Sequence, residues 1–322
     1  MGSITQWIKK NNGPMKLAED CFKRVKKDCF KFIKSQDTTT EKFGDKAGMI
    51  KNYLIPICFW IAKKTKNKKP YFVGLAGGQG TGKTTISSII KIILEKYFKL
   101  KVFKISIDDF YKTRKQRTAL SKKVHPMLIT RGVPGTHDID MMLNLFRKVK
   151  AKKVKALSLP KFDKSVDDRV SKDKWYKIKS KPDIVIFEGW CVGAKSQSKK
   201  QLIKPINSLE RLNDQSMKWR KYVNLNLKNK YKNFHSMMDC LLYLKAENFA
   251  LLRKWRLVQE KKLKITNKDK KNLKVMNKQE VLNFMMTYQR ITEHMFKTAT
   301  KYSSIVMSLN GHHQITKLKY NN

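Results

Sequence analysis

Residues 77–84 read GGQGTGKT and match the pattern G-x-x-x-x-G-K-[ST] at every required position. The apolar stretch YFVGLAG (71–77) leads into this segment, and an apolar helical pattern over residues 84–98 follows it. Glycines let the backbone curl so that its N–H groups converge on phosphate oxygens, and a helix N-terminus favours negative charge. The spacing therefore predicts a phosphate-binding loop between a strand and a helix. The residues expected to contact the phosphates are Gly77, Gly78, Gln79, Gly80, Thr81, Gly82, Lys83, Thr84 and Thr85.

Two residues of this loop have individual expected roles, and an acid from elsewhere joins them. Lys83 can reach the β- and γ-phosphates of a nucleoside triphosphate, and the Thr84 hydroxyl can bind Mg²⁺. Glu188 follows four apolar residues in IVIFEG, at the expected carboxyl end of a strand, where ligands gather in open α/β sheets. Glu188 is expected to hold Mg²⁺ through water or to orient a reacting group; a strand-end acid without a role is the alternative. ATP and Mg²⁺ are the expected cofactors.

The stretch SIDDFY (106–111) places two carboxylates side by side in a chain with 25 Asp and Glu against 72 Lys and Arg. It ends an expected strand over residues 101–108, along which alternation would turn Asp108 and Asp109 to opposite faces. A kinase needs a carboxylate within hydrogen-bond reach of the acceptor hydroxyl. We expect Asp108 to be this general base and Asp109 to be a cap or to support Mg²⁺ binding. The reversed assignment is the alternative, because strand ends twist and bulge.

Strand and helix patterns alternate along most of the chain and must position these groups. Further strands are expected at the start of 154–163 and over 183–190, 240–246 and 303–309, and further helices over 138–150, 247–264 and 278–297. This alternation predicts an α/β fold of the P-loop NTPase type, with a doubly wound, mostly parallel sheet and helices on both faces. Apolar residues at three- and four-residue spacing predict a helical prefix over residues 1–66 packed on the core. Residues 67–322 form the expected P-loop domain of a single globular unit.

Composition narrows the class of protein. The net charge of +47 would attract polyanions, but lysines are spread along the whole chain. Lys, Asn and Ile share A/T-rich codons, so a genome-wide composition bias is the favoured explanation, and nucleic acid is not the expected partner. The five cysteines contain no Cys-x-x-Cys pair, which indicates a reducing compartment. No apolar run approaches the roughly 20 residues of a membrane span. We expect a cytoplasmic protein without a membrane partner, and a monomer is favoured.

A series of motifs occurs in a fixed order: GLAGGQGTGKTT, SIDDFY, RGVPGTHD (131–138), LPKFDKSVDDR (159–169), FEGWCVGAK (187–195), WRKYVN (219–224), WRLVQE (255–260) and TYQRITEHM (287–295). Together they resemble D-glycerate 3-kinase and its bacterial relatives, within the phosphoribulokinase and uridine kinase-like P-loop kinases. The pairing of RGVPGTHD with FEGWCVG is the most specific part. The resemblance implies ATP-dependent phosphorylation of D-glycerate, a small anion, at a primary hydroxyl to give 3-phosphoglycerate.

The resemblance also implies roles for side chains at the acceptor site. A small acid needs donors for its carboxylate, and Arg131, His137 and Arg169 lie in matching motifs; each could instead be a surface cation. The remaining residues assigned to the acceptor site are Asp108, Tyr111, Asp163 and Glu188. After FEGW, the sequence CVGAKSQ departs from the plant-like pattern, which leaves the acceptor open. Uridine, pantothenate and another hydroxy acid are the competing acceptors.

In related kinases an Arg-bearing helix closes over the triphosphate. ALLRKWRLVQE places Arg253 and Arg256 three residues apart on one helical face, so Arg256 is expected to stabilise the transferring phosphoryl group and Arg253 to contact the nucleotide. A solvated basic helix is the alternative. The pair His312-His313 has no accompanying ligand cluster and is interpreted as a surface tail. A nucleic-acid-binding ATPase is the alternative from a different class.

Overall fold

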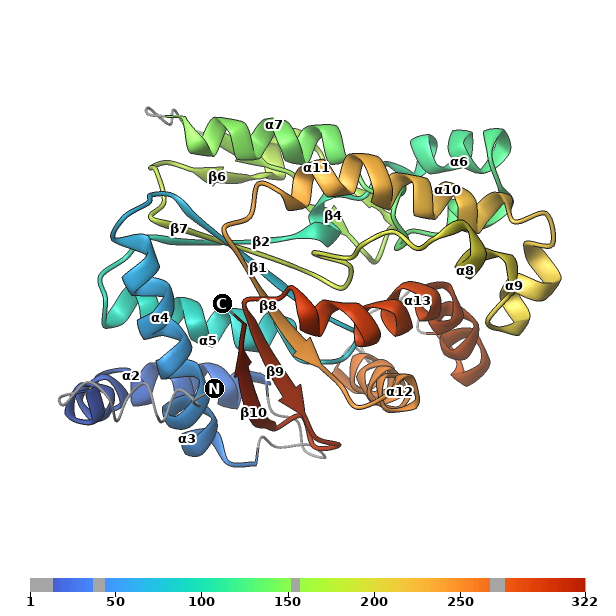
Figure 1. Cartoon of the computed structure of the whole chain (residues 1–322). Coiled ribbons are helices and arrows are strands. Elements are labelled where there is room, and N and C mark those ends of the chain that lie inside the picture. The colour runs from blue at the N-terminus through green and yellow to red at the C-terminus, as the bar shows by residue number, and fades with distance from the viewer. Residues whose placement is uncertain (1–13, 37–43, 152–156, 267–275, 322) are drawn as a thin grey trace.

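The computed structural model describes residues 14–36, 44–151, 157–266 and 276–321. Its central sheet has six strands in the order β10-β9-β8-β1-β7-β2. Every neighbouring pair is parallel except β9 and β10, which are antiparallel. Figure 1 shows the sheet crossing the middle of the molecule. The strands are β1 (Tyr71–Gly77), β2 (Val102–Ser106), β7 (Ile184–Gly189), β8 (Cys240–Lys245), β9 (Ile305–Leu309) and β10 (Ile315–Tyr320).

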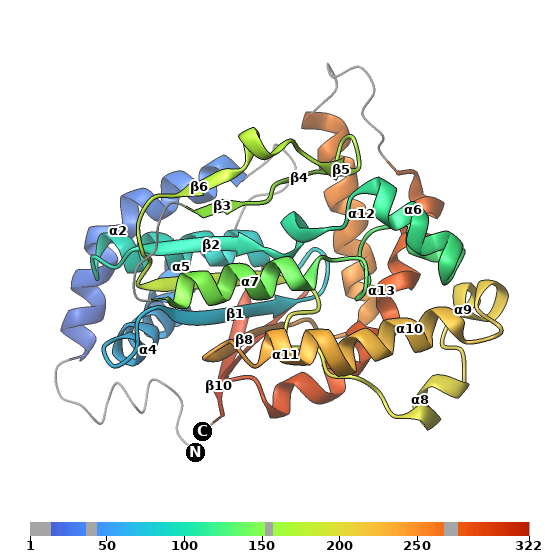
Figure 2. The ribbon, with the colours of Figure 1, turned by 90° about the horizontal axis from the view of Figure 1, so that it is seen from above.

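Helices cover both faces of this sheet, so the expected doubly wound α/β fold is confirmed (Figures 1 and 2). On one face α5 (Lys83–Lys96) packs on the strands, and α2 (Pro14–Gln36) and α4 (Ile55–Thr65) pack on α5. The opposite face carries α7 (Ile139–Lys150), α10 (Lys218–Asn226) and α11 (Lys232–His235). Two long helices, α12 (Phe249–Thr266) and α13 (Lys278–Thr298), follow β8 and precede β9 in the sequence. They pack against each other.

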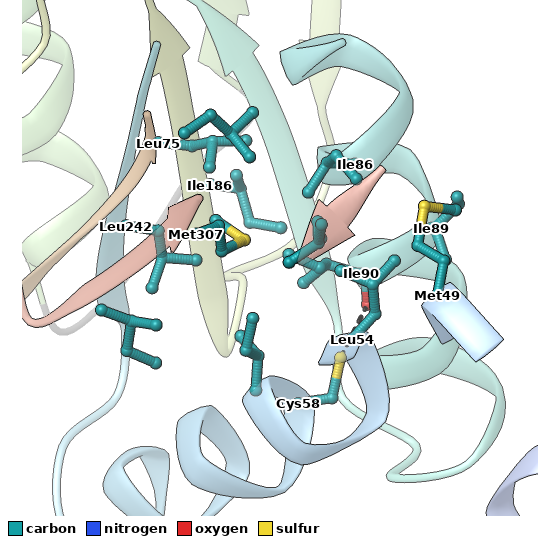
Figure 3. Close-up of a cluster of buried hydrophobic side chains, with 14 of the residues drawn as sticks. Met49, Leu54, Cys58, Leu75, Ile86, Ile89, Ile90, Ile186, Leu242 and Met307 are labelled. Atoms are coloured by element: carbon teal, nitrogen blue, oxygen red, sulfur yellow. Dashed lines mark hydrogen bonds between the residues drawn. The ribbon is translucent and has the colours of Figure 1, made fainter. Parts of the chain in front are cut away.

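The alternation of side chains along the strands explains why both faces are covered. Val73, Leu75 and Ile186 belong to the hydrophobic cluster under α5, whereas Val185 and Phe187 belong to the cluster under α7. The central strands β1 and β7 are therefore buried on both faces, as expected inside a parallel sheet. Figure 3 shows the first cluster, in which Leu75, Ile186, Leu242 and Met307 of the sheet meet Ile86, Ile89 and Ile90 of α5, with Met49, Leu54 and Cys58 of the prefix beyond them.

The helical prefix contributes buried residues to this same cluster. Cys21, Val25, Cys29 and Ile33 recur at four-residue spacing on α2 and are inaccessible to solvent. Their spacing places them on one side of the helix. Residues 1–13 and 37–43 of the expected prefix lie outside the described residues.

Several expectations about element boundaries are wrong. The strand expected over 101–108 ends at Ser106, and the 3-10 helix η2 (Ile107–Phe110) follows it. The strand expected at the start of 154–163 is present as the short β3 (Leu157–Leu159), but it pairs with β6 (Tyr176–Ile178) outside the central sheet, and residues 152–156 lie outside the described residues. A second small sheet joins β4 (Phe162–Asp163) to β5 (Asp168–Arg169). A strand that was not expected, β10, follows the strand expected over 303–309.

Short elements connect the main ones. They are α3 (Lys46–Gly48), η1 (Met49–Leu54), α6 (Arg114–Lys123), η3 (Pro126–Ile129), β3 (Leu157–Leu159), β4 (Phe162–Asp163), β5 (Asp168–Arg169), η4 (Lys172–Lys174), β6 (Tyr176–Ile178), α8 (Lys199–Ile203), α9 (Ser208–Asn213), η5 (Leu227–Tyr231) and η6 (Ala299–Lys301). All five cysteines are buried and free. No helix within the described ranges is long and apolar enough to cross a bilayer.

Candidate active site

The loop between β1 and α5 has the shape of a phosphate cradle. Gly80 and Gly82 both have φ near +80°, a conformation that side chains disfavour. The Thr81 hydroxyl and the Lys83 ammonium group both donate to the Gly78 carbonyl oxygen at 2.9 Å. Burial lowers the pKa of Lys83, while the negative charges of Glu188 and Asp108 oppose this effect. The lysine is thus held at the loop, at the N-terminal end of α5, where a phosphate chain would bind.

Glu188 lies on the face of β7 that α5 covers, because it shares the alternation of Ile184 and Ile186. Its two carboxylate oxygens accept hydrogen bonds from the Thr84 hydroxyl at 2.9 Å and the Ser87 hydroxyl at 2.6 Å. Sequence reasoning missed Ser87, although its position one helical turn after Thr84 is a usable signal. Hydrogen bonds among Glu188, Thr84 and Ser87 thus link the carboxyl end of β7 to the start of α5.

These oxygens fit a magnesium site of the kind that kinases use. Mg²⁺ is usually held by one or two carboxylates together with substrate phosphates and waters, rather than by a cage of protein ligands. The Thr84 hydroxyl and the Glu188 carboxylate supply oxygen atoms of this kind beside the phosphate loop. Thr84 and Glu188 are therefore suitable residues to hold the ion beside a bound nucleotide.

Asp108 and Asp109 lie in η2, directly after β2, rather than in a continuous strand. The Ser106 hydroxyl caps η2 by accepting from the Asp108 amide at 3.2 Å. Ser106 pairs with Glu188 in the register of β2 and β7, so this turn begins beside the carboxyl end of β7. The expected strand alternation of the two acids is wrong, because the chain turns here and both side chains remain partly buried.

The two acids have opposite electrostatic environments. Burial would raise the pKa of Asp108, but an ion pair with Lys164 at 2.6 Å and the Tyr111 hydroxyl at 3.0 Å lower it to about 2. Burial raises the pKa of Asp109 to about 6, against a hydrogen bond from the Phe162 amide at 3.4 Å. Asp108 is therefore fully ionised at neutral pH and has a hydroxyl and an ammonium group as its neighbours.

Tyr111 connects Asp108 to two residues of the RGVPGTHD and DDR motifs. The His137 ring stacks on the Tyr111 ring with centroids 4.5 Å apart, and the two residues also form an isolated antiparallel bridge. The Arg169 guanidinium donates to the Tyr111 carbonyl at 2.8 Å and lies 3.4 Å from the Asp138 carboxylate. Both motif residues therefore contact Tyr111, the residue whose hydroxyl donates to Asp108.

Arg131 contacts the hairpin of β4 and β5, which packs against Tyr111. Its guanidinium pairs with Asp167 and lies 5.4 Å from the centre of the Phe162 ring. That ring makes an edge contact with Tyr111 at 5.2 Å. The fully buried Arg117 holds the hairpin through Asp167 as well. Arg131 is thus a part of the wall around Tyr111 and not an isolated surface cation.

In the described part of the chain, Asp163, which was expected at the acceptor site, forms no hydrogen bond with Asp108, whereas Lys164 does. Asp163 accepts from the Ser165 amide at 2.8 Å and hydroxyl at 2.6 Å, in the turn of the hairpin. Its neighbour Lys164 is the residue that contacts Asp108. The basic residue next to an acid in FDK gave no sequence signal, because lysines are abundant throughout this chain.

The helix α12 lies directly against the phosphate loop. A Cβ atom on Gly80 would come within 2.8 Å of the Trp255 Cβ atom and 3.5 Å of the Arg256 amide nitrogen. The Arg256 guanidinium pairs with Glu260 at 2.6 Å, and the Arg253 guanidinium donates to Gln289 of α13 at 3.2 Å. The expected lid helix is thus beside the loop, while its two arginines contact protein partners.

His313 is part of this assembly, so its interpretation as a surface tail is wrong. It lies in the turn between β9 and β10, and its ring stacks on Trp255 with centroids 4.0 Å apart. Its Nε2 atom is 2.8 Å from the Gly80 carbonyl oxygen. The sequence did not predict β10, so the β9–β10 turn was not expected. Without this turn there was no reason to place His313 beside the phosphate loop.

Comparison with known proteins identifies the family. The family model described as "Phosphoribulokinase / Uridine kinase family" matches residues 72–204. The uncharacterized kinase mug58 of Schizosaccharomyces pombe is 31% identical over 234 residues, which cover 68% of this chain and 79% of that protein. The chain belongs to the phosphoribulokinase/uridine kinase family. As a member of this family it is a P-loop kinase that transfers a phosphoryl group to an alcohol.

Two further relatives of the family carry the name D-glycerate 3-kinase. The chloroplastic enzyme of Arabidopsis thaliana is 26% identical over 227 residues, which cover 65% of this chain and 47% of the plant enzyme. The match thus spans about half of that relative. The solved structure of the Cryptococcus neoformans enzyme covers 85% of this chain and 99% of its own, with a TM-score of 0.71 at 22% identity. The latter comparison supports the shared fold of this kinase.

Proposed function

We propose that this kinase phosphorylates D-glycerate at its primary hydroxyl with Mg-ATP and gives 3-phosphoglycerate. One observation carries the proposal: donors from separate motifs gather around Tyr111, whose hydroxyl donates to Asp108. His137 stacks on Tyr111, Arg169 donates to its carbonyl, and Arg131 lies over the Phe162 ring that touches it. A small hydroxy acid needs this combination of a base and several carboxylate donors. Similarity to the plant D-glycerate 3-kinase supports the same acceptor.

The chemistry assigned to the site follows the requirements of phosphoryl transfer. The Asp108 carboxylate accepts the proton of the acceptor hydroxyl, and the resulting oxygen forms a bond to the γ-phosphorus as the bond to the β-phosphate oxygen breaks. Lys83 and Arg256 would neutralise charge on the transferring group and on the departing ADP. For this, Arg256 would have to leave Glu260, its present partner at 2.6 Å. Bound Mg²⁺ would supply further charge neutralisation near Thr84 and Glu188.

Lys164 would change partner during the reaction. Its ammonium group occupies an oxygen of Asp108 that the acceptor hydroxyl would otherwise approach. Because the lysine side chain is 60% exposed, it can leave Asp108 at a small cost. It would then be available to the carboxylate of the entering acceptor.

The test is an acceptor panel with the purified full chain and Mg-ATP. D-Glycerate, L-glycerate, uridine, pantothenate, ribulose 5-phosphate and no acceptor are compared by release of ADP, and the product is located by phosphorus NMR. We expect ADP release with D-glycerate and a phosphate on the primary hydroxyl. Lys83→Met should abolish turnover with every acceptor. Preferential turnover of uridine or pantothenate would contradict the proposed acceptor while leaving the kinase class intact.

A further inference from the structure

A hydrogen-bonded pair behind the acceptor site has no role in the chemistry described so far. His137 is 1% exposed, and its Nδ1 atom lies 2.5 Å from the hydroxyl oxygen of the fully buried Tyr231. The same hydroxyl oxygen accepts from the Gly135 amide at 3.2 Å. In the described part of the chain, the Nε2 atom of His137 has no hydrogen-bond partner. A buried polar atom in this state is costly unless a ligand satisfies it.

The hydrogen bonds around Tyr231 determine which nitrogen of His137 carries the proton. The Gly135 amide uses a lone pair of this oxygen, so the single hydroxyl hydrogen of Tyr231 is left in need of an acceptor. Among the described residues, the acceptor within its reach is Nδ1 of His137. Burial lowers the pKa of His137 to about 3, against the charge of Asp108, so the ring is neutral. Since Nδ1 accepts, the proton resides on Nε2, which is the unpartnered atom.

Two features of the backbone hold this pair in place. Tyr231 ends the π-helix η5, between α10 and α11, and π-helical turns are frequent at functional sites. Gly135 has φ +101°, and a Cβ atom there would come within 2.5 Å of the Tyr222 ring of α10. The loop that carries His137 is therefore fitted closely to α10, the helix that leads directly into η5 and Tyr231. Figure 1 shows α10 and α11 in succession on the face of the sheet that also carries α7.

The structure assigns Tyr231 as a positioning residue that holds His137 as an Nε2–H donor to a carboxylate oxygen of the acceptor. The assignment deepens the proposed function and rests on it for the identity of the acceptor. His137 is the residue that touches the acceptor, whereas Tyr231 acts through it. The stacking of His137 on Tyr111, which donates to Asp108, places this donor next to the base. A neutral donor binds the carboxylate without adding a cation beside Lys164.

The first test is the tautomer of His137 in the free protein. Nitrogen-15 NMR of the labelled full chain distinguishes the two neutral forms, and the signal of His137 is the one that disappears in His137→Gln. We expect the Nε2–H form in the natural chain and a mixture of both forms in Tyr231→Phe. The Nδ1–H form in the natural chain would overturn the assignment. This readout does not depend on turnover, so it decides the role of Tyr231 even if D-glycerate is not the acceptor.

The second test separates acceptor binding from nucleotide binding. Tyr231→Phe should raise the KM for the acceptor about 10-fold, as expected for a weakened hydrogen bond to a charged group, and leave the KM for ATP unchanged. Tyr243→Phe is the matched control, because Tyr243 is equally buried but lies on β8. An acceptor KM in Tyr231→Phe equal to that of Tyr243→Phe would overturn the assignment. If another acceptor replaces D-glycerate in the panel, the same measurement is made with that acceptor.

Discussion

Asp108 and Asp109 are adjacent in the chain, yet their side chains form hydrogen bonds with different groups. Asp108 meets a hydroxyl and an ammonium group, whereas Asp109 meets a backbone amide. A general base that deprotonates an alcohol must lie within hydrogen-bond distance of the hydroxyl group, so the position of its carboxylate matters before its pKa does. The contacts of Asp108 with Tyr111 and Lys164 therefore favour Asp108 over Asp109, although its pKa is the lower of the two.

Replacing Asp108, the proposed base, should abolish turnover while ATP still binds. Asp108→Asn should lower kcat by at least about 100-fold, because general-base catalysis is typically worth 10²–10⁴-fold. ATP affinity should be nearly unchanged, since the phosphate loop is intact. The measurements are ADP release and equilibrium binding of an ATP analogue. Asp109→Asn is the matched variant, and a larger loss of kcat in it than in Asp108→Asn would reverse the assignment.

Asp109 should instead be visible in the pH dependence of stability. An acid whose pKa folding raises from 3.8 to about 6 binds its proton more tightly in the folded chain. Ionisation of Asp109 therefore destabilises the fold as the pH rises through this window. We expect Asp109→Asn to be more stable than the natural chain by about 1–2 kcal/mol above pH 6, because the side chain is only partly buried.

The stability difference between the two proteins should vanish below about pH 4, where Asp109 is protonated in both the folded and unfolded states. Urea unfolding at a series of pH values provides the measurement. A difference that is the same at all pH values would show that lost packing, and not ionisation, is responsible.

At the scale of elements, the turn of β9 and β10 connects α12 to the phosphate loop. His313 stacks on Trp255 and its Nε2 atom meets the Gly80 carbonyl. His313→Phe keeps a ring for stacking but removes the hydrogen bond, so the KM for ATP should rise about 3- to 10-fold. Initial rates at varied ATP would measure this, with His312→Phe as the control on the exposed neighbour. Equal effects of both substitutions would contradict a contact-specific role.

The packing of α2 on the core can be tested by neighbouring substitutions on one helix. Val25 is fully buried in the cluster that includes α5, whereas Lys27 is exposed. Val25→Ser should destabilise the fold by about 2–3 kcal/mol, because it removes apolar contacts and buries a hydroxyl. Lys27→Ser should change stability by less than about 0.5 kcal/mol. Chemical denaturation provides the comparison, and equal values would show that α2 does not stabilise the core.

At the scale of the whole molecule, the net charge of +47 is the most conspicuous property. Non-specific attraction to nucleic acid should be strong at low salt and should fall to a Kd weaker than about 1 µM at physiological salt. Nucleic acid should not stimulate ADP release. Fluorescence anisotropy with single-stranded DNA and RNA at several salt concentrations, together with the ADP assay, tests both points. Acceptor-independent ATP hydrolysis stimulated by RNA or DNA would assign the charge a function.

The sequence by itself determined the parts of this protein that depend on local patterns. The phosphate loop follows from eight consecutive residues and its flanking apolar segments, since glycine spacing and helix-end polarity act over short distances. The strands β1, β7 and β8 follow from apolar runs, and the helix expected over residues 138–150 is α7. The periodicity of apolar residues and the signals at helix ends depend on residues close together in the chain, so they can be predicted without knowledge of the fold.

Only the tertiary structure decided which side chains meet. The η2 turn replaced a strand because the Ser106 hydroxyl competes for the backbone at the sheet edge. β10 escaped prediction because it is an edge strand with exposed lysines, whose pattern resembles a solvated segment. The contacts of Ser87 with Glu188, Lys164 with Asp108 and Tyr231 with His137 join residues between 56 and 101 positions apart. Such pairs leave no periodic trace in one sequence, because their proximity is created by the packing of whole elements.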